Sequence, residues 1–193
     1  MIVFDSIAKT NNKTTKQQDN QTTRHPQTMS IAEIIKAITV FLRRIRHCAG
    51  FGIQSPTDYA FVREVIYERG EYSLYSDLDR GFPQAGRMER QLAHLLLRVS
   101  NYAQVSDIAI QDDMPEILCH ALRLGCRKSR LVSYKRDETP VSLTVFHDIQ
   151  KRGKAEWNEL LLQPHIVAYD LHYIGLAFYD KKRYTESYII NFY

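Results

Sequence analysis

Hydrophobic residues in the first half of the chain recur every three or four positions, which is the spacing of one face of a helix. Such stripes run through residues 31–45, 56–66 and 86–101. Ser55 and Pro56 stand at the start of the second stripe, and these residue types are preferred at the N-cap and the first position of a helix. The pattern therefore predicts three helices in this part of the chain.

The second half of the chain instead carries short runs of β-branched and aromatic residues, which are typical of strands. These runs occupy residues 105–110, 130–135, 141–149, 165–171, 173–179 and 184–192. Helical patterns at 114–124 and 154–162 separate some of them, and strands that alternate with helices favour a parallel sheet. The polar run from Asp180 to Arg183 predicts that the last two strands form an antiparallel hairpin.

Length and composition fit one globular domain. The 193 residues are 44% hydrophobic and 25% charged, which suits a single core of useful size. We therefore predict an α/β domain over residues 29–193, with a helical part at 29–101 and a sheet part at 104–193. Residues 1–28 are rich in Asn, Gln, Thr and Lys and are predicted to be a disordered extension, so Met29 is a second candidate start of translation.

The charge and the cysteines narrow the possible partners. The net charge is only +4, and about half of it lies in residues 1–28, which argues against nucleic acid as a partner. No run approaches the roughly 20 apolar residues that span a bilayer, so we expect a cytoplasmic protein with no membrane partner. Cys48, Cys119 and Cys126 form no pair at metal-ligand spacing, so we expect reduced thiols and no metal site.

Two sets of motifs lie at opposite ends of the domain. The first is Gly-Phe-Gly-Ile-Gln-Ser-Pro at residues 50–56, which follows a basic helix. The second comprises Phe146-His147-Asp148-Ile149, Trp157, Pro164, Asp170-Leu171, Gly175-Leu176 and Ile189-Ile190-Asn191-Phe192. Together they resemble a family of bacterial class I methyltransferases that depend on S-adenosylmethionine (SAM). The resemblance covers residues 30–101 and 141–193, and it implies a Rossmann-like sheet, here of about six strands, with SAM as the cofactor if the family activity is retained.

The turn after the first strand departs from that family. It reads Ile110-Gln111-Asp112-Asp113-Met114-Pro115, and no glycine lies between Gly86 and Gly125. A Rossmann-like cofactor site needs glycines here, because the backbone must approach the cofactor closely. Asp112 and Asp113 are the remaining candidates for cofactor binding, although carboxylates at this place also stabilise the first turn of a helix. Gly125 is predicted to be the left-handed residue that ends this helix.

The connection after the second strand is also unusual. The resemblance implies an acidic residue there to hold the cofactor ribose, but Lys135 and Arg136 occupy the place. Only about five residues, 136–140, lead to the next strand, where the family has two further strands with their helices. A parallel return along a six-residue strand spans about 20 Å, whereas five extended residues reach about 17 Å. The sequence therefore allows either a hairpin or an extended crossover that uses residues assigned above to strands.

His147 and Asp148 are the best remaining candidates for catalysis. They end a strand at the edge where ligands of open α/β sheets bind. Neighbours on a strand point to opposite faces, so we do not expect the two side chains to act as one dyad. Tyr72 and Tyr75 are candidates for ligand stacking or for simple packing.

These observations favour a methyltransferase-like protein without a working SAM site, which serves as an interaction or structural module. In such a module, side chains should fill the sheet edge beside Asp112. An exposed apolar patch that includes Tyr173 and Phe178 should mark where a second copy, in a homodimer, or another protein partner binds.

Two alternatives stay open. One is an active SAM-dependent methyltransferase with a remodelled site. The other is a phosphate or nucleic-acid binder that acts through the basic end of the first helix, where Arg43, Arg44 and Arg46 lie.

Overall fold

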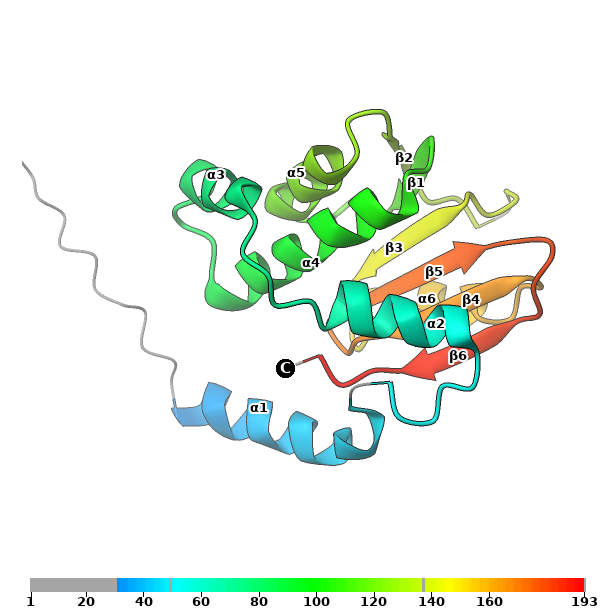
Figure 1. The fold of residues 1–193 in the computed structure, drawn as a ribbon, viewed down its shortest axis with the longest axis horizontal. Helices are drawn as coiled ribbons and strands as arrows, with labels where there is room; N and C mark the ends of the chain where they lie inside the picture. Colours follow the sequence, from blue (N-terminus) through cyan, green and yellow to red (C-terminus); the bar gives the residue numbers. More distant parts are fainter. Residues whose placement is uncertain (1–30, 49, 137, 193) are drawn as a thin grey trace, which may run out of the picture.

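The computed structural model describes residues 31–48, 50–136 and 138–192, which form a six-stranded mixed sheet with helices on both faces (Figure 1). The predicted α/β class and the prediction of about six strands are confirmed. The predicted extension at residues 1–28 and Met29 lie outside the described residues.

Four α-helices precede the sheet. They are α1 (Ile31–Arg43), α2 (Pro56–Phe61), α3 (Ser73–Gly81) and α4 (Arg87–Ala103). A 3-10 turn at Ile45–His47 follows α1, and a π-helical turn at Val62–Ile66 continues α2. The prediction of three helices is wrong, because α3 has too few large apolar residues among its nine to form a periodic stripe.

The motif at residues 50–56 is a turn that leads into α2. Gly50 and Gly52 have φ angles of +79° and +88°, which residues with side chains rarely adopt. Ser55 then caps α2 as predicted, since its hydroxyl accepts the backbone N–H of Asp58 at 3.4 Å. The motif therefore sets the direction in which α2 leaves the end of α1.

The sheet has the strand order β2-β1-β3-β5-β4-β6. Its strands are β1 (Asp107–Ile110), β2 (Arg130–Ser133), β3 (Leu143–His147), β4 (Ile166–Asp170), β5 (Ile174–Tyr179) and β6 (Glu186–Ile189). β1 pairs in parallel with β2 and β3, and β4 pairs in parallel with β6. β5 is antiparallel to both of its neighbours, β3 and β4.

The predicted hairpin of the last two strands is wrong. β5 is buried along its first four residues and fits between two neighbours, whereas β6 is mostly exposed and forms an edge. The antiparallel hairpin joins β4 to β5 instead, and β6 crosses over to pair with β4. The buried strand β5 takes an inner position and the exposed strand β6 takes the edge. The local pattern of residues 184–192 does not reveal this difference.

The short connection between β2 and β3 is a parallel crossover. The two strands lie in parallel on opposite sides of β1, so the hairpin alternative is wrong. The crossover runs from residue 134 to residue 142, and it uses Tyr134, Lys135, Val141 and Ser142, which the pattern had assigned to strands. Both strands are shorter than predicted, so more residues are available to span the distance between them.

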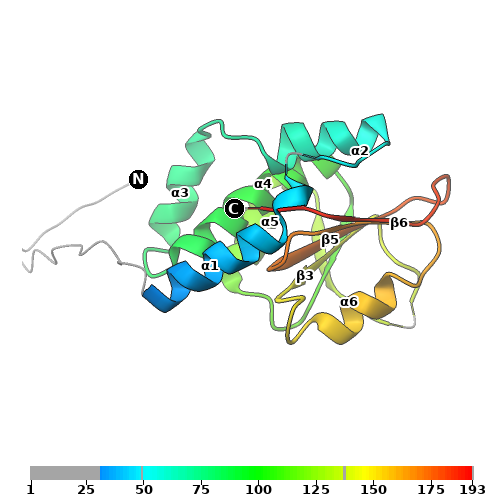
Figure 2. The same cartoon turned by 90° about the horizontal axis from the view of Figure 1, so that it is seen from below.

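Helices cover the two faces of the sheet unequally (Figure 2). α4 and α5 (Glu116–Gly125) pack against each other and, with α2, cover one face, while α6 (Lys154–Leu160) covers the other. Side chains of β3 alternate between the two cores. Val145 lies in the larger core, and Phe146 lies in the smaller core with Trp157.

Gly125 does not end α5 in the left-handed conformation, so this prediction is wrong. Gly125 is the last residue of the helix, and its φ is not positive. A Cβ atom at this position would lie 2.2 Å from the carbonyl oxygen of Leu97 in α4. A glycine is needed here because the backbones of the two helices approach each other closely.

Candidate functional site

The edge at the carboxyl ends of β1 and β3 is where the methyltransferase resemblance would place a cofactor. Gln111, directly after β1, extends its side chain across this edge. Its Oε1 accepts the backbone N–H of His147 at 2.7 Å, and its Nε2 donates to Glu156 of α6 at 3.1 Å. A Cβ atom at Gly153 would lie only 2.9 Å from the Gln111 amide nitrogen. The Gln111 side chain is therefore packed between the end of β1, the end of β3 and the start of α6.

The candidate carboxylates at this edge do not converge on one ligand position. Asp112 points toward β2 and accepts the hydroxyl of Ser133 at 2.5 Å. Asp113 and Asp148 share the guanidinium group of Arg152, at 3.1 Å and 3.6 Å. The structure thus brings Asp113 and Asp148 together through a cation, and it leaves Asp112 outside this group.

His147 and Asp148 have different surroundings, as their neighbouring places on the chain predict. His147 is partly buried at the end of β3, and burial lowers the pKa of its imidazole. Asp148 adopts a left-handed φ of +52°, and its N–H donates to the carbonyl of Tyr173 at 2.7 Å. Asp148 therefore starts the turn after β3.

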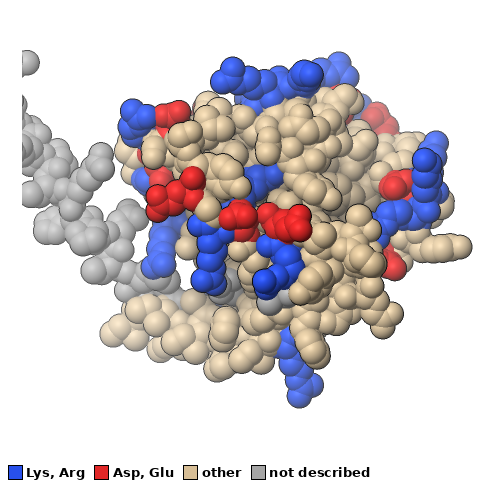
Figure 3. Space-filling model, viewed as in Figure 1, with Lys and Arg blue, Asp and Glu red and all other residues tan. Residues whose placement is uncertain are grey.

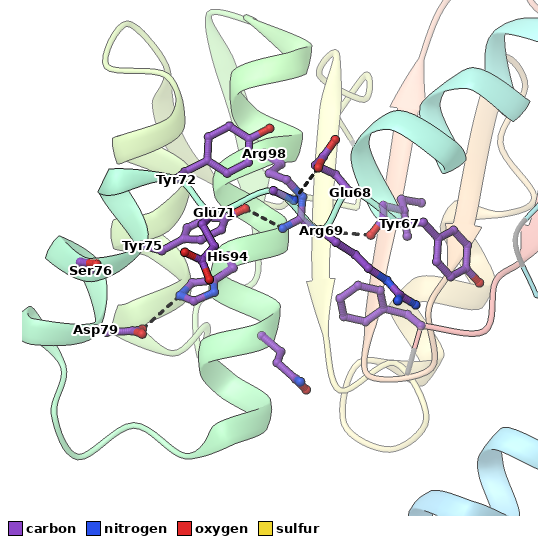
Figure 4. A pocket seen from close by; sticks show the side chains of 14 residues that line it. Tyr67, Glu68, Arg69, Glu71, Tyr72, Tyr75, Ser76, Asp79, His94 and Arg98 are labelled. Carbon is purple, nitrogen blue, oxygen red and sulfur yellow. Dashed lines mark hydrogen bonds and ion pairs between the residues drawn. The ribbon is translucent and has the colours of Figure 1, made fainter.

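A cavity of about 550 Å³ opens between the end of the π-helical turn, α3 and α4 (Figure 4). The residues that line it include Tyr72, Tyr75, Asp79, His94, Arg98 and Phe192. The sequence singled out the two tyrosines, but it gave no signal for His94 or Arg98, because the apolar stripe of α4 dominates its pattern. The cavity is lined mainly by helical residues, together with Phe192, which follows β6.

Four polar residues along the wall of this cavity, Tyr75, Asp79, His94 and Arg98, contact one another. The ring of Tyr75 stacks on His94 at 4.0 Å with an interplanar angle of 7°, and His94 Nε2 lies 3.1 Å from Asp79. Arg98 donates to the Tyr75 hydroxyl at 2.7 Å and to the backbone carbonyl of Val65 at 2.8 Å. Burial raises the pKa of Tyr75, although Arg98 opposes the shift. These contacts join α3 to α4, and Tyr72 at the rim is the more exposed ring.

A buried ionic cluster around Asp58 joins α2 to the far strands of the sheet. The carboxylate accepts hydrogen bonds from both terminal nitrogens of Arg183, at 2.7 and 2.5 Å. It also accepts hydrogen bonds from the hydroxyls of Tyr169 and Tyr188, at 2.7 and 3.1 Å. Burial by itself would raise the pKa of Asp58, but the hydrogen bonds from Arg183, Tyr169 and Ser55 lower it to about 2. The sequence showed Asp58 only as a first-turn anion, because its partners lie more than 100 residues away.

The basic end of the first helix is not a uniform cationic surface. Arg43 and Arg46 are exposed, but Arg44 is largely buried. The Arg44 guanidinium donates to the Asp170 carboxylate at 2.6 Å and to the carbonyl of Ile190 at 3.1 Å. Of the three arginines proposed to bind phosphate, one is thus engaged inside the molecule.

Tyr173 and Phe178 do not form an exposed apolar patch, so this prediction is wrong. Both side chains are partly buried and pack against the larger core. The ring centroid of Phe178 lies 5.2 Å from that of Phe61 in α2. The exposed large apolar side chains of the described residues are concentrated on α1 instead.

Comparison with protein-family models, with curated proteins and with solved structures gives no match to this chain. The resemblance to SAM-dependent methyltransferases therefore stays a prediction from the motifs. Within the described residues, no helix is long and apolar enough to cross a lipid bilayer. The described His, Cys, Asp and Glu side chains form no group of three that could hold a metal ion.

Proposed function

We propose that this protein is a methyltransferase-like protein without a working SAM site, and that it serves as an interaction or structural module. The observation that carries the proposal is the position of Gln111. Its side chain occupies the edge beside β1 and is hydrogen-bonded on both of its polar atoms.

A ligand at this edge would have to displace Gln111. Displacement would leave the N–H of His147 without its partner, and burying an unpaired polar group costs about 1–3 kcal/mol. The turn also lacks the glycines that let a backbone approach a cofactor, and the Met114 N–H already donates to the Gln111 carbonyl at 3.2 Å. These features support a filled edge rather than a cofactor crevice.

The surface of the described residues offers more for a macromolecular partner than for a small substrate. In the cavity between α3 and α4, Tyr75, Asp79, His94 and Arg98 are engaged with one another, whereas α1 exposes a continuous apolar stripe. Large exposed apolar patches mark interaction sites in soluble proteins. This contrast supports an interaction module over the alternative of a remodelled active site, and the burial of Arg44 weakens the alternative of a phosphate binder.

Isothermal titration of the full chain with SAM, and with its demethylated product, tests the proposal. We expect no heat of binding up to millimolar ligand, from protein whose circular dichroism shows it to be folded. A dissociation constant in the micromolar range would contradict the proposal. In that case Asp112→Ala and Tyr72→Ala locate the ligand, because the first changes the sheet edge and the second changes the cavity between α3 and α4.

A further inference from the structure

The helix α1 carries its apolar side chains on the outside of the molecule. Seven large apolar residues of α1 and the turn after it are exposed, from 37% for Phe41 to 77% for Ile31. They are Ile31, Ile34, Ile35, Ile38, Phe41, Leu42 and Ile45. In Figure 3 the lower edge of the molecule, where α1 lies, shows few charged side chains. An apolar stripe of this length normally faces a protein core.

The spacing of these seven residues follows a heptad. Residues 31, 38 and 45 occupy position a, residues 34 and 41 position d, and residues 35 and 42 position e. All three a positions are isoleucine. A seam of a and d residues is the pattern by which one helix packs along another helix.

The stripe cannot turn inward, because the opposite side of α1 is anchored to the body. Val40 is 8% exposed, and Arg44 is held by Asp170 and the carbonyl of Ile190. The side-chain amide of Asn191 also donates to the carbonyl of Phe41 at 3.3 Å. At 100° per residue, Val40 lies on the far side of the helix from Ile38. The orientation of the stripe is therefore fixed by the fold.

The exposed apolar area is large enough for a specific interface. From the exposed fractions, the seven side chains present on the order of 700 Å², close to the roughly 800 Å² that each partner contributes to a standard-size interface. The largest apolar patch on a typical monomer is about 300–600 Å².

We propose that α1 pairs with α1 of a second copy of this chain, so that the two stripes form the core of a symmetric homodimer. The inference rests on the proposed function, for which it names the partner. A self-complementary apolar seam is what a two-fold interface requires, since the same surface contributes on both sides. The seam has no charged residue within it, so a second identical seam meets it without an unpaired charge.

The charges on α1 favour an antiparallel pairing. Arg43 and Arg46 are exposed near the C-terminal end of the stripe, and Lys36 is exposed near its middle. A parallel pair would place the arginines of both copies together, where like charges repel. In an antiparallel pair they lie at opposite ends of the interface.

A membrane surface fits these observations less well. An interfacial helix needs only an apolar face and a basic polar face, without heptad spacing. The exposed cations of α1 flank the stripe on one side, while the body of the molecule, with Val40 and Arg44, occupies the other side. The spacing and the one-sided flank therefore favour a protein helix as the partner.

Light scattering after size-exclusion chromatography of the full chain tests the proposal. We expect a mass twice the 22.6 kDa of one chain at micromolar concentration. Ile38→Lys places a charge at the central a position, where it is buried in the dimer, and should raise the dissociation constant about 100-fold or more. Thr39→Lys is the matched control, because it adds the same charge to an exposed neighbour outside the stripe, and it should leave the dimer intact.

Three outcomes would overturn this inference. The wild-type chain could stay monomeric up to about 100 µM, a concentration at which most standard-size interfaces form. It could stay monomeric but float with vesicles of anionic phosphatidylglycerol, which would identify a membrane surface as the partner. A dimer unaffected by Ile38→Lys would use another surface. A dimer that binds SAM would leave the pairing of α1 standing and remove the proposed function, so the two failures are distinguishable.

Discussion

Asp58 shows how a single residue links distant parts of this chain. Its carboxylate is 2% exposed, and it lies within hydrogen-bonding distance of Arg183, Tyr169 and Tyr188. Removing one partner of a buried ion pair leaves the other charge uncompensated. The effect of Asp58 on stability therefore exceeds that of any ordinary surface carboxylate.

Asp58→Asn keeps the size of the side chain and removes its charge. We expect the free energy of unfolding to fall by about 2–3 kcal/mol, measured by urea denaturation, because the Arg183 guanidinium loses its nearer carboxylate and retains Glu186 at 3.7 Å. Asp77→Asn is the control, since the pair of Asp77 with Arg80 is exposed and contributes little. Equal losses from the two variants would mean that Asp58 does not act as a buried ion-pair partner.

The same cluster predicts how the stability changes in acid. The pKa of Asp58 is lowered from 3.8 to about 2 in the folded protein, so between these values the unfolded state binds more protons than the folded state. The contribution of Asp58 is fully present above about pH 4 and is lost as the pH falls toward 2. The wild type should lose stability more steeply than Asp58→Asn over this interval.

Gly175 allows the single tryptophan of the chain to pack on β5. A Cβ atom at Gly175 would lie 2.6 Å from the ring of Trp157. Gly175→Ala must therefore displace the indole, and we expect a loss of about 1–3 kcal/mol with a changed tryptophan emission spectrum. Gly81→Ala is the control, because nothing lies within 4 Å of its Cβ position. An unchanged emission spectrum in Gly175→Ala would contradict this packing.

At the scale of elements, the local residue pattern predicts that a helix or strand exists better than it predicts which strands pair. The strands and α4 to α6 follow from hydrophobic spacing, which each segment carries by itself. The local pattern does not predict α3, because Leu74, Tyr75 and Leu78 are too few to form a stripe. It does not predict the position of β6 in the sheet, because that position depends on which strand is buried. It does not predict the role of Gly125 either, because the close neighbour of Gly125 is the Leu97 carbonyl of another helix. Strand pairing and helix–helix contact depend on two segments of the chain, so the pattern of one segment does not predict them.

The link between α1 and the C-terminal residues also belongs to a pair of segments. Arg44 joins Asp170 and Ile190, and the N–H of Asn191 donates to the carbonyl of His47 at 3.0 Å. The basic segment that precedes the first set of motifs thus contacts Asp170, Ile190 and Asn191 of the second set.

Arg44→Met should loosen this link while it keeps the aliphatic part of the side chain. Because Asp170 loses its partner, we expect the local opening free energy of α1 and of Asn191 to fall by about 2–3 kcal/mol. Hydrogen exchange measured by mass spectrometry should show faster exchange there and no change in α4. Arg43→Met is the control, since Arg43 is exposed. Unchanged exchange in α1 would show that other contacts hold the helix.

At the scale of the whole molecule, part of the candidate site could be predicted from the sequence. The missing glycines between Gly86 and Gly125 indicated an altered cofactor edge, because glycine is read directly from the chain. The position of the Gln111 side chain could not be read in this way, since it depends on His147 and Glu156, 36 and 45 residues further on. Likewise, the amphipathic pattern of α1 was evident, but only the fold shows that its apolar side faces outward.

The long-range contacts of the N-terminal helices have a consequence for the order in which the protein matures. Arg44 meets a partner 126 residues later in the chain, and Asp58 meets one 125 residues later. At the roughly 5–20 residues per second of ribosomal synthesis, α1 and α2 wait about 6 to 25 s for these partners to be made. Until those partners are made, α1 and α2 lack the ion pairs that anchor them to the rest of the molecule.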